Sequence, residues 1–210
     1  MYINNYFEAS GNCNSYININ GNVNQTSGTV ILNYCNFNCL NATGGANFIA
    51  NNSIDNFLLE GYCLNTGITI NAPVSASLYW VGGSGEWNDN AHWSVTSGGA
   101  GGACVPGYYD DVVIDNNSGL NFADSIHVGA KNIFCRNFTW TNTSTGVHFL
   151  NDTVSQNFTI TGSLNLNSNV EFDYTQHGVS FIRFGVVRSL RRKRYLYRRK
   201  CSRLFRLSRL

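Results

Sequence analysis

The sequence predicts an all-β protein, with a parallel β-solenoid as the favoured architecture and an antiparallel two-sheet sandwich as the alternative. Short β-favourable runs recur along the chain, their residues alternate between apolar and polar, and Asn, Gly, Ser or Thr separate them. Charged residues make up only 12%, and Ala, Glu, Lys and Leu are scarce, which argues against a coiled coil or a helical bundle. No apolar run reaches about 18 residues, so no membrane-spanning segment is predicted.

The predicted strands share β-branched or aromatic residues and are bounded by turn residues. They cover residues 16–19, 29–34, 47–50, 57–59, 68–70, 112–114, 126–128, 138–140, 147–150, 158–160, 164–166 and 170–172. The alternation in Tyr16-Ile17-Asn18-Ile19-Asn20 is typical of a strand that buries one face. We therefore expect most strands to have one buried side and one side that faces solvent.

A recurring phrase favours the solenoid. Asn-Phe-Thr at 137–139 returns at 157–159, twenty residues later, and Asn-Phe pairs also stand at 47–48 and 56–57. In a parallel solenoid each turn of chain stacks on the previous one, so a phrase that returns about every 20 residues fits one coil. The 31 Asn residues suit the corners, because Asn tolerates left-handed backbone and its amide bonds the backbone or the Asn of the next coil. The same spacing also allows a sandwich with Asn-rich turns.

One stretch, residues 79–94, is more specific than the rest. It holds three Trp residues within fourteen positions, separated by glycines and polar residues: Trp80, Trp87 and Trp93. Three indoles so close together are too bulky for one strand. We expect a compact loop or hairpin that packs the indoles over the end or side of a β core, with glycines that let the backbone pass close to the rings. The chain then re-enters the sheet at residues 111–115.

The wording of this stretch resembles the W-x-G-G-x-G-x-W-x-D-x-x-x-W-S … P-x-x-x-D-x-V-x-[IF]-D modules of very large secreted and cell-surface repeat proteins of Bacteroidetes-type bacteria. The residues that fill the pattern are Trp80, Gly82, Gly83, Gly85, Trp87, Asp89, Trp93, Ser94, Pro106, Asp110, Val112, Ile114 and Asp115. The resemblance covers residues 78–117 and extends more faintly to 174. It implies an adhesin-like β-solenoid architecture and export with a separate C-terminal sorting domain, and it supplies no catalytic residues.

The resemblance and the charge distribution divide the chain into three parts. Residues 1–76 are interpreted as the end of a preceding β module, 77–187 as the Trp-motif module and 188–210 as a basic tail. Up to residue 187 the chain has three basic residues against 12 acidic ones, a net charge of −9, whereas the tail has 11 basic residues and no acidic one. We interpret the tail as disordered or out of frame, and the chain as a fragment of a larger protein, which also accounts for the missing signal peptide.

The Trp-rich stretch contains the candidate glycan-contact residues. Aromatic faces stack on the apolar faces of sugar rings, while amides and carboxylates bond sugar hydroxyls. The candidates of these two kinds are Trp80, Trp87, Trp93, Asn88 and Asp89. The competing interpretation, which we favour, is that the indoles are buried as a local core.

A second candidate site consists of carboxylates. Asp110, Asp111 and Asp115 offer the oxygen ligands that calcium prefers. They match neither the EF-hand loop nor the nonapeptide calcium repeat, so solvated turn carboxylates are the favoured interpretation. No cofactor is predicted, and calcium is the one metal that these residues would suit.

The cysteines and histidines show no metal-site or catalytic spacing. The seven cysteines are widely spaced, and we expect mainly buried thiols, with one or two disulfides as the alternative. The four histidines lie far apart and are expected to be ordinary surface or strand residues.

These features predict a non-catalytic structural or adhesive module of a secreted or cell-surface protein, which contacts surface glycans or other cell-surface proteins. One alternative is a polysaccharide lyase or hydrolase on a β-helix, although such sites need clustered Asp, Lys and Arg, and the body has few basic residues. Another is nucleic-acid or membrane contact through the basic tail. The body itself lacks a positive stripe, so it is not expected to bind nucleic acid.

Overall fold

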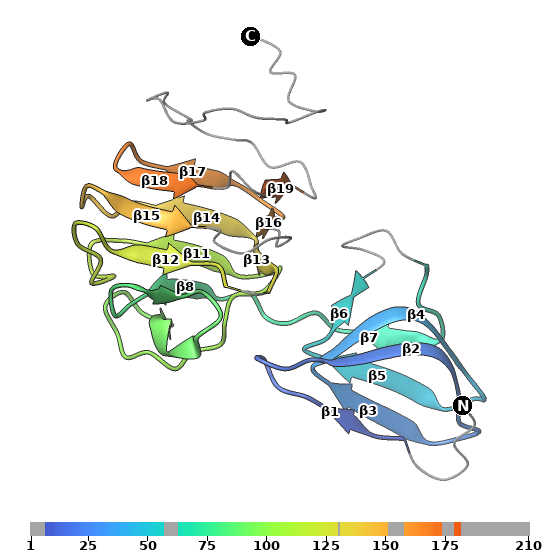
Figure 1. The fold of residues 1–210 in the computed structure, drawn as a ribbon. Helices are drawn as coiled ribbons and strands as arrows, with labels where there is room; N and C mark the ends of the chain where they lie inside the picture. The colour runs from blue at the N-terminus through green and yellow to red at the C-terminus, as the bar shows by residue number, and fades with distance from the viewer. Residues whose placement is uncertain (1–6, 57–62, 130, 151–157, 174–178, 182–210) are drawn as a thin grey trace, which may run out of the picture.

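The computed structural model describes residues 7–56, 63–129, 131–150, 158–173 and 179–181, and these residues form an all-β structure (Figure 1). Strands β8 and β10 run antiparallel, and every other pairing between the described strands is parallel. The predicted all-β fold with parallel sheets is therefore confirmed, and the antiparallel sandwich is not formed. The predicted strand at 57–59 and the basic tail lie outside the described residues.

The first part of the chain builds two parallel sheets, with strand orders β1-β3-β5-β7 and β2-β4-β6 (Figure 1). The bounds of these strands are β1 (Ala9–Ser10), β2 (Ile17–Asn24), β3 (Thr29–Asn33), β4 (Cys35–Thr43), β5 (Asn47–Asn51), β6 (Ile54–Asp55) and β7 (Ile68–Ile70). Odd and even strands alternate along the chain, so each turn of chain adds one strand to each sheet. We call this part the first stack.

The second stack has three sheets, with strand orders β10-β8-β11-β14-β17, β18-β15-β12-β9 and β13-β16-β19. Its strands are β8 (Ser77–Trp80), β9 (Gly85–Glu86), β10 (Trp93–Ser94), β11 (Asp111–Ile114), β12 (Ser125–His127), β13 (Ile133–Cys135), β14 (Asn137–Trp140), β15 (Val147–Leu150), β16 (Phe158–Ile160), β17 (Leu164–Leu166), β18 (Val170–Asp173) and β19 (Val179–Phe181). A short 3₁₀ helix, η1 (Asn90–His92), precedes β10.

The register of the second stack corrects the predicted coil length. Phe138 pairs with Val112 on one side and Leu164 on the other, so neighbouring positions in this sheet are 26 residues apart. Phe158, which repeats the Asn-Phe-Thr phrase, lies in a different sheet and pairs with Ile133. The two phrases occupy similar strands of different sheets and do not stack on each other. In the first stack Val30 pairs with Phe48, 18 residues later.

Asparagine side chains link neighbouring coils, as the sequence predicted. In the first stack Asn36 donates from Nδ2 to Asn18 Oδ1 at 3.0 Å, and Asn41 donates to Asn22 Oδ1 at 3.1 Å. Each pair joins residues that are aligned across β2 and β4. Because such ladders need side chains that both donate and accept, an uncharged amide can stand beside its own copy where two Lys or two Glu would repel each other.

Each stack encloses its own hydrophobic core. The first is built from buried residues of β2 to β5 and the loops between them: Val23, Val30, Leu32, Cys35, Phe37, Leu40, Ala42, Phe48 and Ala50. The second is larger and is dominated by aromatic side chains, among them four Trp residues. Buried and solvent-facing residues alternate in most strands, as in Thr29–Asn33 and Asp111–Ile114, which confirms the expected one-sided burial.

The cysteines differ from the expectation of mainly buried thiols. Cys13 is bonded to Cys104, 91 positions away, and Cys39 is bonded to Cys63. Among the described cysteines, Cys35 and Cys135 are free and buried. Chain proximity in the stacks brings together residues whose spacing in the sequence gave no hint of pairing. No helix of the described chain has the length and apolar character needed to cross a membrane.

Candidate functional site

The Trp-rich stretch closes one end of the second stack. From β8 the chain passes through β9 and η1 into β10, which turns back and pairs with β8 so that Trp93 faces Trp80 and Ser94 faces Tyr79. β10 is the outermost strand of its sheet, and it covers the edge of β8 that β11 leaves open. Residues 77–107 therefore form a cap, which we call the Trp-Gly cap.

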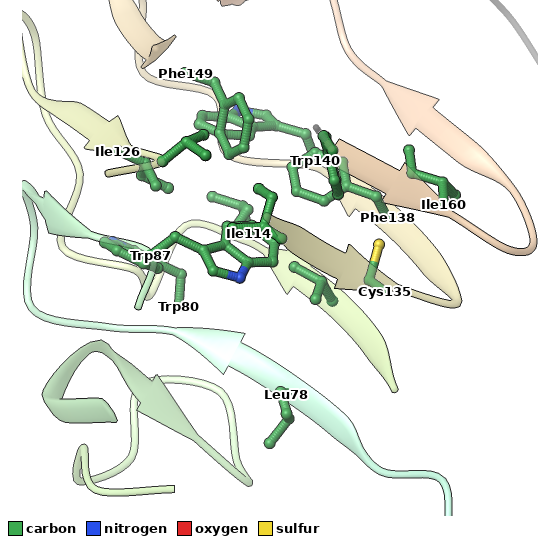
Figure 2. Packing of buried hydrophobic residues seen from close by; sticks show 14 of the residues in the cluster. Leu78, Trp80, Trp87, Ile114, Ile126, Cys135, Phe138, Trp140, Phe149 and Ile160 are labelled. Carbon is green, nitrogen blue, oxygen red and sulfur yellow. The ribbon is translucent and has the colours of Figure 1, made fainter. Parts of the chain in front are cut away.

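The three indoles of the cap lie in the core. Trp80, Trp87 and Trp93 each have a relative exposure of 0%. Figure 2 shows Trp80 and Trp87 in the interior beside Ile114, and the Trp87 ring also packs against Phe138 and Phe149 with centroid distances of 6.1 and 5.8 Å. A sugar ring has no indole face to stack on in this structure, so the glycan-contact assignment of the three Trp residues is wrong. Their burial matches the favoured interpretation of a local core.

Backbone carbonyls of the cap bind two of the indole N–H groups. Trp80 Nε1 donates to Gly83 O and Trp93 Nε1 donates to Trp87 O, each at 2.7 Å. A buried indole needs such a partner, because an unpaired N–H loses its hydrogen bond to water. The turns after Trp80 and Trp87 thus supply acceptors to the rings that they surround.

His92 is the cap residue that sequence reasoning missed. Its imidazole stacks on Trp80, with ring centroids 4.7 Å apart and an interplanar angle of 7°. Its Nδ1 lies 2.8 Å from Val81 O, and Val81 N–H donates to His92 O at 2.9 Å, so the residue joins η1 to the end of β8. The available signal was the position of His92 directly before the third Trp. The lack of any metal-site spacing led to its being taken as an ordinary residue.

The motif glycines are explained by close approach and backbone conformation. Gly82 and Gly83 have φ angles of 86° and 76°, a region that residues with a Cβ rarely adopt. Gly85 lies against the His92 ring, and a Cβ at this position would overlap it. Ser94 and Pro106 are buried, Ser94 beside the indoles and Pro106 in the loop that leads back to the sheet.

The polar candidates of the Trp-rich stretch hold the cap to its neighbours. Asn88 donates from Nδ2 to Val128 O at 3.1 Å, which ties the cap to the end of β12. Asp89 Oδ1 accepts from Ala91 N–H at 2.9 Å and begins η1. Because the indoles are buried, these two side chains do not form one binding surface with them.

The three aspartates proposed for calcium have separate structural partners. Asp110 accepts from Ala76 N–H at 3.0 Å and from Gly107 N–H at 2.9 Å. Asp111 forms a bidentate pair with Arg136, with N–O distances of 2.7 and 2.6 Å. The Asp115 carboxylate accepts from the Ser97 hydroxyl and from Asn117 N–H.

These contacts shift two of the aspartates in opposite directions. Partial burial raises the pKa of Asp110, and the hydrogen bonds from Gly107 and Ala76 offset only part of this effect. Burial also raises the pKa of Asp111, but the hydrogen bonds from Arg136 and Asn137 and the charge of Arg136 outweigh it, so the pKa is lowered overall. In the part of the chain that the structure describes, no group of three or more His, Cys, Asp or Glu side chains is arranged to hold a metal ion.

Two polar contacts lie on the sheet of β9, β12, β15 and β18. Ser125 Oγ is 2.7 Å from His127 Nε2, and His148 Nδ1 is 3.1 Å from Glu171 Oε2. Ser125, His148 and Glu171 are aligned across three neighbouring strands. Both contacts are of the kind that stabilises neighbours on one sheet face, and we assign them no catalytic role.

No protein-family model, curated protein or solved structure matches the chain. The resemblance of residues 78–117 to the Trp-Gly modules stays a prediction from the motif residues. The Trp-Gly cap is thus the most specific feature of the molecule, and its contacts are structural.

Proposed function

We propose that the chain is a non-catalytic structural module of a secreted or cell-surface β-solenoid protein, in which stacked coils serve as a spacer and present an adhesive surface. The observation that carries the proposal is the Trp-Gly cap. Stacked coils expose an open strand edge at each end, and repeat architectures need such ends to be closed. A motif whose conserved-looking residue types all serve to close one end is what a module within a long array requires.

The disulfides support an extracellular setting. Cys13–Cys104 joins the first stack to the cap of the second, and Cys39–Cys63 lies within the first stack. Structural disulfides persist in oxidising compartments and are rare in the cytosol. Together with the connection at residues 71–76, the Cys13–Cys104 bond gives the two stacks two covalent links, which suits a spacer that must transmit force.

The surface chemistry supports contact with uncharged partners. Within residues 7–56 and 63–76 the charged side chains are Glu8 and Asp55, and there is no Lys or Arg. Protein surfaces usually carry many more charges, so the solubility of this part depends on amide and hydroxyl groups. Such groups both donate and accept hydrogen bonds, as the hydroxyls of glycans do.

The test combines shape with activity on polymers. Small-angle scattering of the oxidised full chain should give one elongated particle, and incubation with pectin-like and alginate-like polymers should release no new chain ends. A glycan array then measures adhesion. Release of chain ends that is abolished by changing one Asp would overturn the proposal in favour of a polysaccharide lyase or hydrolase. An array without any binding, from an intact elongated particle, would leave the spacer role alone.

A further inference from the structure

The outer face of β2 and β4 is an array of amide side chains. Along each strand the outward positions are asparagines, with one threonine at the end of β4. The aligned pairs are Asn18–Asn36, Asn20–Asn38, Asn22–Asn41 and Asn24–Thr43. We call these eight residues the asparagine face. Outward positions on one strand are about 6.8 Å apart and neighbouring strands about 4.8 Å apart, so the face presents a regular grid of polar groups.

A β-bulge keeps this face in phase. The register between β2 and β4 shifts after Asn20, where Cys39 stands as an extra residue with a φ of 58°. Without the extra residue, alternation after Asn38 would turn Leu40 outward and Asn41 inward. With it, Leu40 is 1% exposed and Asn41 is solvent-exposed. The disulfide to Cys63 holds the bulged residue, so the backbone irregularity serves to continue the row of amides.

Hydrogen bonds order the side chains of the grid. The amide of Asn36 donates to Asn18, that of Asn41 to Asn22 and that of Asn24 to Thr43, at 3.0 to 3.1 Å. The row continues toward the next coil, because Thr66 donates from Oγ1 to Asn41 Oδ1 at 2.8 Å. A surface whose side chains are already fixed loses less conformational entropy when it binds a partner.

The charge of the face determines which partner it fits. The grid itself has no charged residue, and residues 7–56 and 63–76 contain no basic one. Nucleic acids and anionic lipids are bound through Lys and Arg, so neither is complementary to this surface. A polymer with many hydroxyls and no charge is complementary, because each amide offers two donors and an acceptor to hydroxyl groups.

We propose that the asparagine face is the adhesive surface of the module and that it binds an uncharged polysaccharide laid along β2 and β4. This inference rests on the proposed function and assigns its adhesive part to named residues. The buried indoles of the Trp-Gly cap take no part in this contact.

The experiment measures binding of the full chain to uncharged polysaccharides (a β-glucan, an α-glucan, a mannan and a galactan) and to alginate as a charged polymer. The variant Asn20→Ala/Asn38→Ala removes one aligned pair from the centre of the grid. The matched control, Thr29→Ala/Asn47→Ala, removes an aligned, exposed polar pair from the outer face of β3 and β5. We expect at least one uncharged polymer to bind, the grid variant to bind it about tenfold more weakly and the control to bind it like the wild type.

Each other outcome overturns the proposal in a recognisable way. Equal weakening in both variants, or in neither, would show that the polymer binds elsewhere, while the adhesive function would stand. Preference for alginate would refute the charge argument. Self-association of the wild type that the grid variant loses, measured by sedimentation, would make a second copy of the chain the occupant. If no uncharged polymer binds a folded wild-type chain, the face is not a glycan site and only the spacer role stands. Circular dichroism of each variant checks that the fold is retained.

Discussion

The imidazole of His92 lies parallel to the indole of Trp80, with ring centroids 4.7 Å apart, and Gly85 lies against the other side of the imidazole. The stacked pair places η1 and β10 against β8. The absence of a side chain at residue 85 thus determines whether the cap can close. The glycine is required for close packing, whereas Gly82 and Gly83 are required for their positive φ angles.

Replacing Gly85 by Ala should destabilise the second stack by about 1–3 kcal/mol, because the new Cβ would displace the His92 ring from Trp80. Chemical denaturation followed by Trp fluorescence measures the change. Gly107→Ala is the matched control, since a Cβ there would lie 3.7 Å from its nearest neighbour. The double variant Gly85→Ala/His92→Ala should be less destabilised than the sum of its parts, and strict additivity would contradict the proposed contact.

Trp93→Ala should cost about 3–5 kcal/mol, because it empties a fully buried site and removes the ring that packs between Trp80 and Trp87. Val95→Ala, two residues later and 67% exposed in the wild type, should change the free energy of unfolding by less than about 0.5 kcal/mol. A urea titration of both variants makes the comparison. Similar values for the two would mean that the cap does not belong to the cooperative unit of the second stack.

Removal of the disulfide that joins the two stacks should separate their unfolding. The closed loop of 91 positions corresponds to about 4–5 kcal/mol in the chain-entropy model. The variant Cys13→Ser/Cys104→Ser should therefore melt earlier and in two steps. As a control, Cys39→Ser/Cys63→Ser should destabilise the first stack alone, since both cysteines lie within it. Calorimetry distinguishes these results, and a single unchanged transition in the first variant would refute the coupling.

Tyr16 should make stability sensitive to alkaline pH. Burial, followed by the charges of Asp110, Tyr34 and Tyr109, raises its pKa from 10.0 to about 12. The folded state therefore favours the protonated phenol, so this contribution is complete below pH 10 and is lost as the pH rises from about 10 to 12. The difference in unfolding free energy between wild type and Tyr16→Phe, measured from pH 8 to 12, should shrink across that range. A constant difference would show that Tyr16 does not titrate in this way.

The strands were predictable where alternation was regular. Residues 68–70, 147–150, 158–160 and 164–166 were predicted with the bounds that the structure shows. β4 was missed, although it is the longest strand, because the bulge at Cys39 breaks its alternation and its many Asn residues read as turns. The ends of strands in loops of unequal length also could not be predicted, so the coil was expected to be about 20 residues long and is 26 in the sheet of β11, β14 and β17.

The candidate site was predictable in composition and wrong in purpose. The three indoles and their glycines were recognised as one compact unit, and the prediction that the chain re-enters a sheet near residue 111 is confirmed by β11. Whether an aromatic cluster faces solvent or core depends on the tertiary neighbours, here Phe138 and Phe149, which lie more than 40 residues along the chain. The pairing of cysteines depends on the same distant contacts. Neither is encoded in a local pattern.

The reversed direction of β10 gives the second stack a polarity. A further parallel strand added beyond β10 would meet a ladder that runs the wrong way, so hydrogen bonding cannot continue across the cap. In a tandem array, every copy that carries the Trp-Gly phrase would begin its own core and would not extend that of its predecessor. Unravelling under tension, or an error of folding in one copy, would then stop at the next set of indoles and leave the following copy intact.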